Sequence, residues 1–124
     1  MTPWLLVALG GAFGAVGRFA VNGLLFPLFG PRFPFATLVI NAAGSLLMGV
    51  CYVLIIERGV LAGEWRDLLM VGVLGAFTTF SAFSLDAVAL WQNGHLLLAL
   101  GYVLASVILS IGGLALAIYF TRLL

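Results

Sequence analysis

The sequence predicts an all-α integral membrane protein with four transmembrane helices, and three observations support this fold class. The 124-residue chain is 65% hydrophobic and only 7% charged, and a soluble domain of this size cannot bury so much apolar surface. Four apolar stretches each approach the roughly 20 residues that cross a bilayer as a helix. Trp4, Trp65 and Trp91 fall near the ends of these stretches, where amphipathic rings favour the membrane interface.

The four apolar stretches place the spans at residues 4–26, 35–56, 68–91 and 96–120. The connections between them are short, and they cover residues 27–34, 57–67 and 92–95. The start of the first stretch has no basic region, and the stretch is too long for a signal peptide, so we expect a transmembrane helix there. We therefore expect residues 1–124 to form a single four-helix transmembrane domain.

The arginines bear on how the chain sits in the membrane. Three arginines lie on one predicted side of the membrane: Arg58, Arg66 and Arg122. Arg32 lies on the other side, and Arg18 lies in the half of the first span that is nearer to Arg32. A fixed orientation normally shows a clear excess of positive residues on the cytoplasmic side. The near balance leaves two interpretations open: a weakly biased fixed topology, or insertion in both orientations as an antiparallel two-fold pair. The absence of Lys and the net charge of +1 argue against binding of nucleic acid.

The first span carries a stripe of small residues followed by a charge. Gly10, Gly14 and Gly17 are spaced by four and three residues, as in transmembrane helices that pack closely against a neighbour. A nucleotide-binding use of these glycines is excluded because no βαβ unit surrounds them. Arg18 follows directly, and an intramembrane charge needs a partner or water. Asp86 is the acid at a similar depth, so the two either pair or both line an aqueous vestibule.

Hydroxyl and amide side chains mark the second and fourth spans. Asn41 and Ser45 are four residues apart on one face of the second span, where a buried amide must find hydrogen bonds. It either joins two helices or lines a pore. Tyr102, Ser106 and Ser110 also recur every four residues, so their hydroxyls share one face of the fourth span. Such a stripe can donate hydrogen bonds to an anion without trapping it by charge.

The centre of the third span predicts a break in the helix. The segment GAFTTFSAFS, residues 75–84, contains Gly75, Thr78 and Thr79, and all three are weak helix formers. A break at mid-membrane frees backbone carbonyls and amides. Such backbone is tolerated only where it is buried in protein or lines a cavity, and there it often binds ions.

Phenylalanines and serines surround the predicted break. Phe77, Phe80 and Phe83 are spaced by three residues and are expected to form one stripe, with Ser81 and Ser84 adjacent. Aromatic rings have electropositive edges. The stripe is either ordinary helix packing or a set of ring edges that contact an anion without a fixed positive charge.

Taken together, these segments resemble the Fluc (CrcB) family of fluoride channels, and the resemblance covers essentially the whole chain. It is carried by GGAFGAVGR in the first span, NAAGSLLMG in the second, GAFTTFSAFSLD in the third and the Tyr-Ser-Ser stripe in the fourth. The third segment is the specific one. The sequence departs from the family pattern at Ala82, where the family often has Thr, and at Asp86, where it often has Glu.

The resemblance implies a dual-topology, antiparallel homodimer in a bacterial inner membrane, with two pores that let cytosolic fluoride leave passively. It implies a structural sodium ion at the dimer axis, held by main-chain oxygens of Gly75 and Thr78 from each subunit, and a position for Arg18 near the vestibule. Phe80 and Phe83 of both subunits would present ring edges to fluoride. The residues of the implied fluoride pathway are Asn41, Phe80, Ser81, Phe83, Ser84, Tyr102, Ser106 and Ser110.

Three other functions fit the sequence less well than a channel. A small multidrug-resistance-like transporter, which couples efflux to protons, also has four helices, but it needs a carboxylate in the first span, and this chain has Arg18 there. A structural subunit of a larger complex would not need the hydroxyl stripe. An enzyme is not supported, because the lone His95 lies in a loop and no nucleophile, base and acid occur together.

Overall fold

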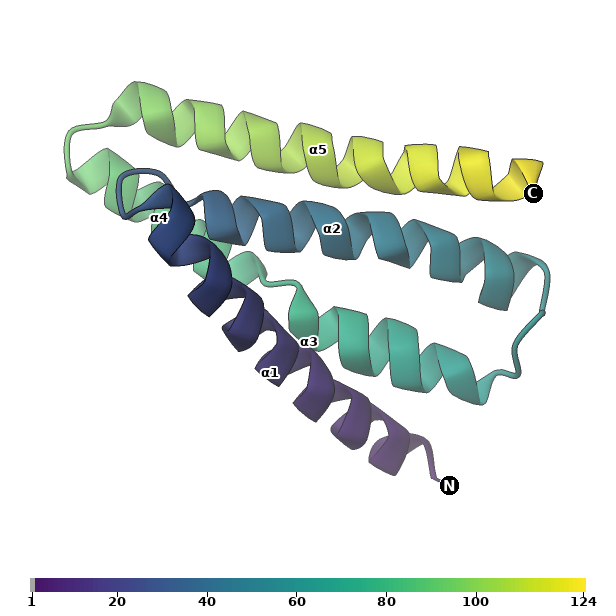
Figure 1. Cartoon of the computed structure of the whole chain (residues 1–124). Coiled ribbons are helices and arrows are strands. Elements are labelled where there is room, and N and C mark those ends of the chain that lie inside the picture. Colours follow the sequence, from purple (N-terminus) through teal and green to yellow (C-terminus); the bar gives the residue numbers. More distant parts are fainter. Residues whose placement is uncertain (1) are drawn as a thin grey trace.

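The computed structural model describes residues 2–124, and within this range it has four helices that are long and apolar enough to cross a membrane. These spans are Pro3–Phe29, Phe35–Glu57, Arg66–Gln92 and Leu96–Leu123. They alternate in direction, so that the N-terminus, the loop between the second and third spans and the C-terminus lie at one end of the molecule (Figure 1). The all-helical fold class and its four spans are confirmed.

Two of the spans are composite. The first span is α1 (Pro3–Phe29) and the fourth is α5 (Leu96–Leu123). The second consists of α2 (Phe35–Cys51) followed by a π-helical end, η1 (Tyr52–Glu57). The third has three pieces: the π-helical η2 (Arg66–Leu74), the short α3 (Gly75–Phe77) and α4 (Phe80–Gln92).

Helix α1 ends three residues later than the sequence predicts. It was expected to stop at Phe26, but it continues through Pro27 and ends at Phe29. A proline this close to the end of a helix removes one backbone donor and interrupts little that follows. The terminating residue is Gly30, whose φ of 75° favours glycine and whose amide donates to the Phe26 carbonyl at 2.8 Å.

The glycine stripe of α1 packs against the first half of the third span. Gly10 and Gly14 are buried, and a Cβ added to Gly72 of η2 would lie only 2.9 Å from the Cα of Gly10. The close-packing role predicted for these glycines is therefore confirmed at Gly10 and Gly14. Gly17 is looser, since an added Cβ would meet only the Phe77 ring, at 3.8 Å.

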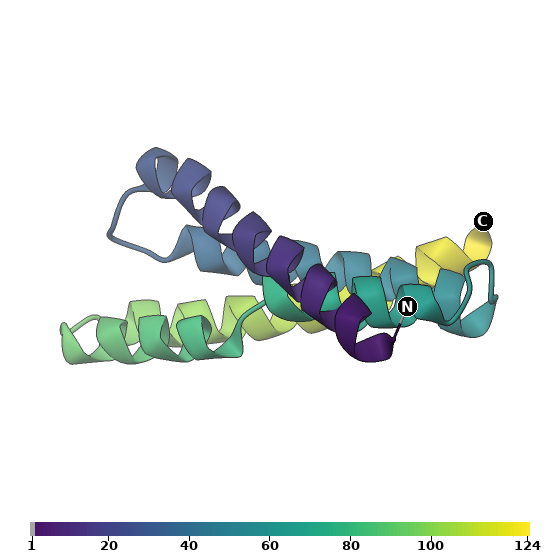
Figure 2. The ribbon, with the colours of Figure 1, turned by 90° about the horizontal axis from the view of Figure 1, so that it is seen from below.

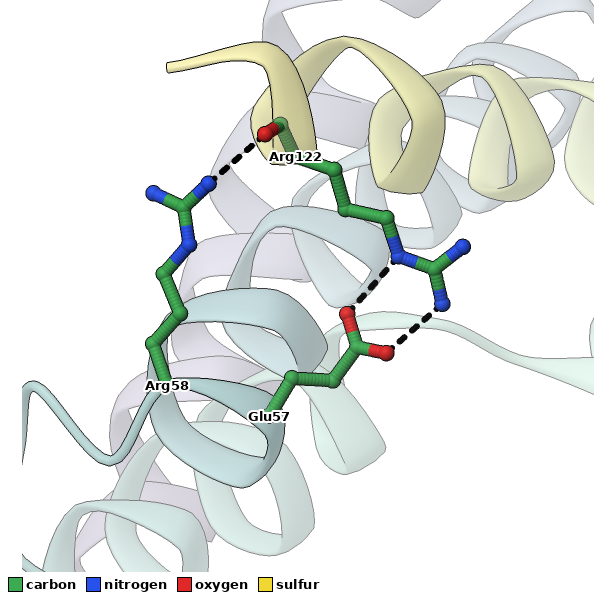
Figure 3. A network of polar contacts seen from close by, with 3 residues as sticks. All are labelled: Glu57, Arg58 and Arg122. Carbon is green, nitrogen blue, oxygen red and sulfur yellow. Dashed lines mark hydrogen bonds and ion pairs between the residues drawn. The ribbon is translucent and has the colours of Figure 1, made fainter.

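Helices α2 and α5 lie side by side and run in the same direction (Figure 1). At their C-terminal ends a polar network connects the second span to the fourth (Figure 3). Arg122 donates two hydrogen bonds to the Glu57 carboxylate, at 2.8 and 2.6 Å, and Arg58 donates to the Arg122 carbonyl at 2.8 Å. These groups are exposed, so their attraction is screened by water and salt.

The opposite end of the molecule is more open. Seen from below, the C-terminal half of α1 diverges from α4 (Figure 2). A small core lies at this end, where α4 turns into α5, and it consists of Leu38, Leu90, Ala99 and Tyr102. Most large apolar side chains instead lie exposed on the outside of the chain, as expected where lipid or another protein surface takes the place of water.

Candidate ion pathway at the break in the third span

The third span is interrupted where the sequence predicts a break. Helix α3 ends at Phe77, and α4 begins at Phe80. The two residues between them are extended, with φ and ψ of −79° and 154° at Thr78 and −148° and 115° at Thr79. Both are β-branched, and β-branched side chains favour extended over helical backbone. The break is confirmed, and it lies inside an apolar span.

The amide of Asn41 on α2 joins this break by two reciprocal hydrogen bonds. The Thr79 N–H donates to Asn41 Oδ1 at 2.7 Å, and Asn41 Nδ2 donates to the Thr79 carbonyl at 3.0 Å. In a continuous helix the Thr79 N–H would donate to the carbonyl of Gly75, four residues earlier. The side chain of Asn41 therefore takes up a donor that Gly75 would otherwise receive.

The hydroxyl of Thr79 likewise accepts a hydrogen bond from a backbone amide, about one turn further along the chain. Thr79 is the N-cap of α4, and its Oγ1 accepts from the Ala82 N–H at 3.1 Å. A continuous helix would send that N–H to the Thr78 carbonyl. Sequence reasoning missed this role of Thr79, although Thr three residues before a helical amide at a predicted break is a recognisable capping signal.

The aromatic rings of α4 and α5 form a connected group. Phe80 and Phe83 have ring centroids 5.4 Å apart, and Phe83 and Tyr102 are 5.3 Å apart. Phe80 is 79% exposed, so most of its ring is uncovered by its own chain. The predicted single stripe is wrong at Phe77, which lies before the break and beside Gly44 of α2, because two extended residues interrupt the helical register.

The hydroxyl stripe of α5 differs along its length. Tyr102 and Ser106 are buried, and Ser110 is partly exposed. Ser106 Oγ is the buried side-chain oxygen without a hydrogen-bond partner among residues 2–124. On α4, Ser84 Oγ donates to the Phe80 carbonyl at 2.9 Å, and Ser81 Oγ lies 3.2 Å from Thr79 Oγ1.

Arg18 and Asp86 line one cavity of about 700 Å³ between the diverging ends of α1 and α4. No ion pair joins them within residues 2–124, so the ion-pair interpretation is not observed. That the shared cavity is an aqueous vestibule stays a prediction. Asp86 Oδ2 instead accepts from the Tyr102 hydroxyl at 3.1 Å.

The contact between Asp86 and Tyr102 is not among those predicted from the sequence, yet the connection between the third and fourth spans carries a signal for it. Asp86 precedes Gly94 by eight residues (94 − 86), and Tyr102 follows it by eight (102 − 94). A tight antiparallel helical hairpin brings residues equidistant from its turn together. The spacing therefore indicates that these two side chains face each other.

Comparison with known proteins shows which family the whole chain resembles. Residues 5–118 match the family model described as "CrcB-like protein, Camphor Resistance (CrcB)". The chain is 51% identical to the "Fluoride-specific ion channel FluC" of Saccharophagus degradans, over 96% of this chain and 89% of the relative. It is 51% identical to the protein of that name from Cereibacter sphaeroides (89% of this chain, 86% of the relative) and 46% identical to that of Hahella chejuensis (95% and 93%).

Proposed function

The chain belongs to the CrcB family, and we propose that it is a fluoride channel, which lets fluoride cross the membrane passively. The relatives compared above are named as fluoride-specific ion channels. The observation in this chain that best supports the proposal is the Ser106 hydroxyl, which is buried and has no partner within residues 2–124. An unsatisfied buried hydroxyl is costly, and a passing anion would supply the acceptor that it lacks.

The pathway follows the uncharged donors of α4 and α5, together with the amide of Asn41. Fluoride is small and strongly hydrated, so a selective path must replace its water with many modest donors. Hydroxyls, a side-chain amide and aromatic ring edges provide donors without a deep electrostatic trap, which conduction forbids. In this proposal Phe80 and Phe83 present ring edges, and the remaining contacts come from Ser81, Ser84, Tyr102, Ser106 and Ser110. Arg18 lies at the aqueous vestibule that feeds this path.

The functional unit in this proposal is an antiparallel homodimer with two pores. Phe80 leaves most of its ring uncovered, and a second copy would complete the aromatic surroundings of the ion. The nearly balanced arginines support insertion in both orientations, and an antiparallel pair is a closed two-fold arrangement.

A structural sodium ion fits the break. The carbonyls of Gly75 and Thr78 each lack the amide that a continuous helix would give them, since Thr79 N–H donates to Asn41 and Ala82 N–H to Thr79. Carbonyl oxygens are suitable ligands for a hard cation. When bound between two copies, sodium would neutralise the carbonyl dipoles that the break exposes inside the membrane.

The proposed setting is a bacterial inner membrane, where the channel would confer fluoride resistance. Fluoride enters a cell as the neutral acid, is trapped by deprotonation and would leave through the channel down its gradient. The multidrug-transporter alternative is disfavoured, because α1 carries no carboxylate.

Two experiments test the proposal. Purified protein in liposomes loaded with potassium fluoride should release fluoride to a fluoride electrode, and failure to release it would overturn the channel function. For the dimer, Val60→Lys with Gly63→Lys adds positive charge to an exposed loop, where Gly63 has room for a side chain. This variant should fix one orientation and lose activity, with rescue by an oppositely biased copy. Full activity of the fixed variant alone would contradict the antiparallel dimer.

A further inference from the structure

Two backbone amides next to the break donate to side chains instead of to backbone carbonyls. A break in a helix separates backbone N–H donors from the carbonyl acceptors that they would otherwise pair with. Either group could then find a new partner while the other stays unpaired. In this chain the amides of Thr79 and Ala82 are both bonded to side chains, Asn41 Oδ1 at 2.7 Å and Thr79 Oγ1 at 3.1 Å. Each of these bonds removes a donor from a particular carbonyl four residues earlier, that of Gly75 or of Thr78.

We infer that Asn41 and Thr79 are positioning residues for the cation site: by taking up the Thr79 and Ala82 amides, they keep the Gly75 and Thr78 carbonyls available for the ion. The inference rests on the proposed sodium site and adds the residues that build it. Neither side chain needs to touch the ion. They act as outer-shell groups, whose loss typically weakens metal binding about 10- to 100-fold.

The surroundings support a defined role for both residues. Thr79 is buried, so its hydroxyl has no alternative partner in water, and it also lies 3.2 Å from Ser81 Oγ. Asn41 uses both ends of its amide, since Nδ2 donates to the Thr79 carbonyl at 3.0 Å while Oδ1 accepts. This pair fixes the peptide of Thr79 against α2, a separate span. The break is thus held open by a neighbouring helix rather than by its own sequence alone.

Thr78 provides a contrast at the neighbouring position. Its N–H and its Oγ1 both donate to the Leu74 carbonyl, at 3.1 and 3.0 Å. These bonds complete the end of the preceding helix and take no donor away from Gly75 or Thr78. Two adjacent threonines therefore have different tasks: Thr78 closes the helix before the break, and Thr79 caps the helix after it.

The test measures sodium dependence of thermal unfolding, with N-methyl-glucamine as the replacing cation. Asn41→Leu removes the acceptor for the Thr79 amide, and Thr79→Val is nearly isosteric but removes the cap. Both should raise the sodium concentration for half-maximal stabilisation at least about tenfold. Thr79→Ser keeps an oxygen that accepts the Ala82 amide, so it should titrate close to the parent protein. Ser45→Ala, one turn along α2, is the matched control, since Ser45 has no hydrogen bond to the break within residues 2–124.

The outcomes separate the inference from the proposed function. If the parent protein responds to sodium while Asn41→Leu and Thr79→Val respond equally well, the positioning role is wrong and the sodium site stands. If the parent protein shows no response to sodium, the sodium site itself is wrong, and the inference falls with it. If Asn41→Leu does not fold, the sodium response of Thr79→Val decides whether the inference holds. Fluoride release by the parent protein is measured independently and reports on the channel function.

Discussion

Replacement of Phe80 by Ile separates an ion-contacting role of the aromatic rings from a packing role. The change keeps much of the apolar volume and removes the electropositive ring edge. Phe80 is 79% exposed and has one aromatic neighbour within residues 2–124, Phe83, with ring centroids 5.4 Å apart. Loss of such a pair costs about 0.5–1.5 kcal/mol. Within one chain, the substitution should therefore reduce stability only slightly.

The expected effect on fluoride transport is larger. A ring that contacts a desolvated ion contributes about 2 kcal/mol, by analogy with cations on ring faces. Since about 1.4 kcal/mol corresponds to a factor of ten in rate, Phe80→Ile should lower the fluoride flux per dimer by roughly 10- to 30-fold. Phe83→Ile should lower flux similarly and destabilise the protein more, because Phe83 also contacts Tyr102, at 5.3 Å.

The assay combines fluoride efflux from liposomes with the yield and thermal stability of the dimer. Phe13→Ile is the matched control, since Phe13 on α1 is 74% exposed and lies outside the proposed pathway. It should leave both the flux and the stability close to those of the parent protein. Near-normal flux per dimer in both Phe80→Ile and Phe83→Ile, with loss of dimer stability, would refute the ring-edge reasoning and leave these rings as packing residues.

Two further perturbations address the helix packing and the vestibule. Gly14→Leu should disrupt the contact between α1 and η2, because an added Cβ already overlaps the Val73 carbonyl. We expect destabilisation of about 1–3 kcal/mol or more, as for overpacked cores, measured as loss of folded protein in detergent. Gly11→Leu should be tolerated, because an added Cβ meets no neighbour at that position. Tyr102→Phe removes the hydroxyl that donates to Asp86 at 3.1 Å and keeps the ring contacts. It should lower the free energy of unfolding by about 1.5–3 kcal/mol, as for hydrogen bonds to charged groups, and reduce the fluoride flux. Unchanged flux would exclude the Tyr102 hydroxyl from the pathway.

The sequence predicted the spans and the position of the break because both depend on local properties. Apolar length specifies a transmembrane helix, and adjacent threonines after a glycine disfavour its continuation. The small residues at Gly10 and Gly14 likewise predicted close packing, since no other common side chain allows backbones to approach so closely. The location of the hydroxyl stripe on one face of α5 followed from its four-residue spacing.

The partners of the polar groups were harder to predict, because they depend on which helices are neighbours. Asn41 was expected either to join helices or to line a pore, and only the packing of α2 against the break shows that both ends of its amide bond to Thr79. An ion pair between Arg18 and Asp86 was one of two interpretations, because the two residues are expected at a similar depth in the membrane. It does not form, because α1 diverges from α4 at this end (Figure 2) while the hairpin brings Tyr102 to Asp86.

The central claim is that the chain conducts fluoride passively as an ion. The most direct test measures whether fluoride release from liposomes needs a compensating movement of positive charge. Liposomes loaded with potassium fluoride and reconstituted with the protein should retain fluoride until valinomycin lets potassium leave, because uncompensated efflux builds up an opposing voltage. Release should then be rapid, without a proton gradient, while chloride stays inside under the same conditions. Fluoride release that needs a proton gradient and ignores valinomycin, or equal release of chloride, would contradict a passive fluoride-selective channel.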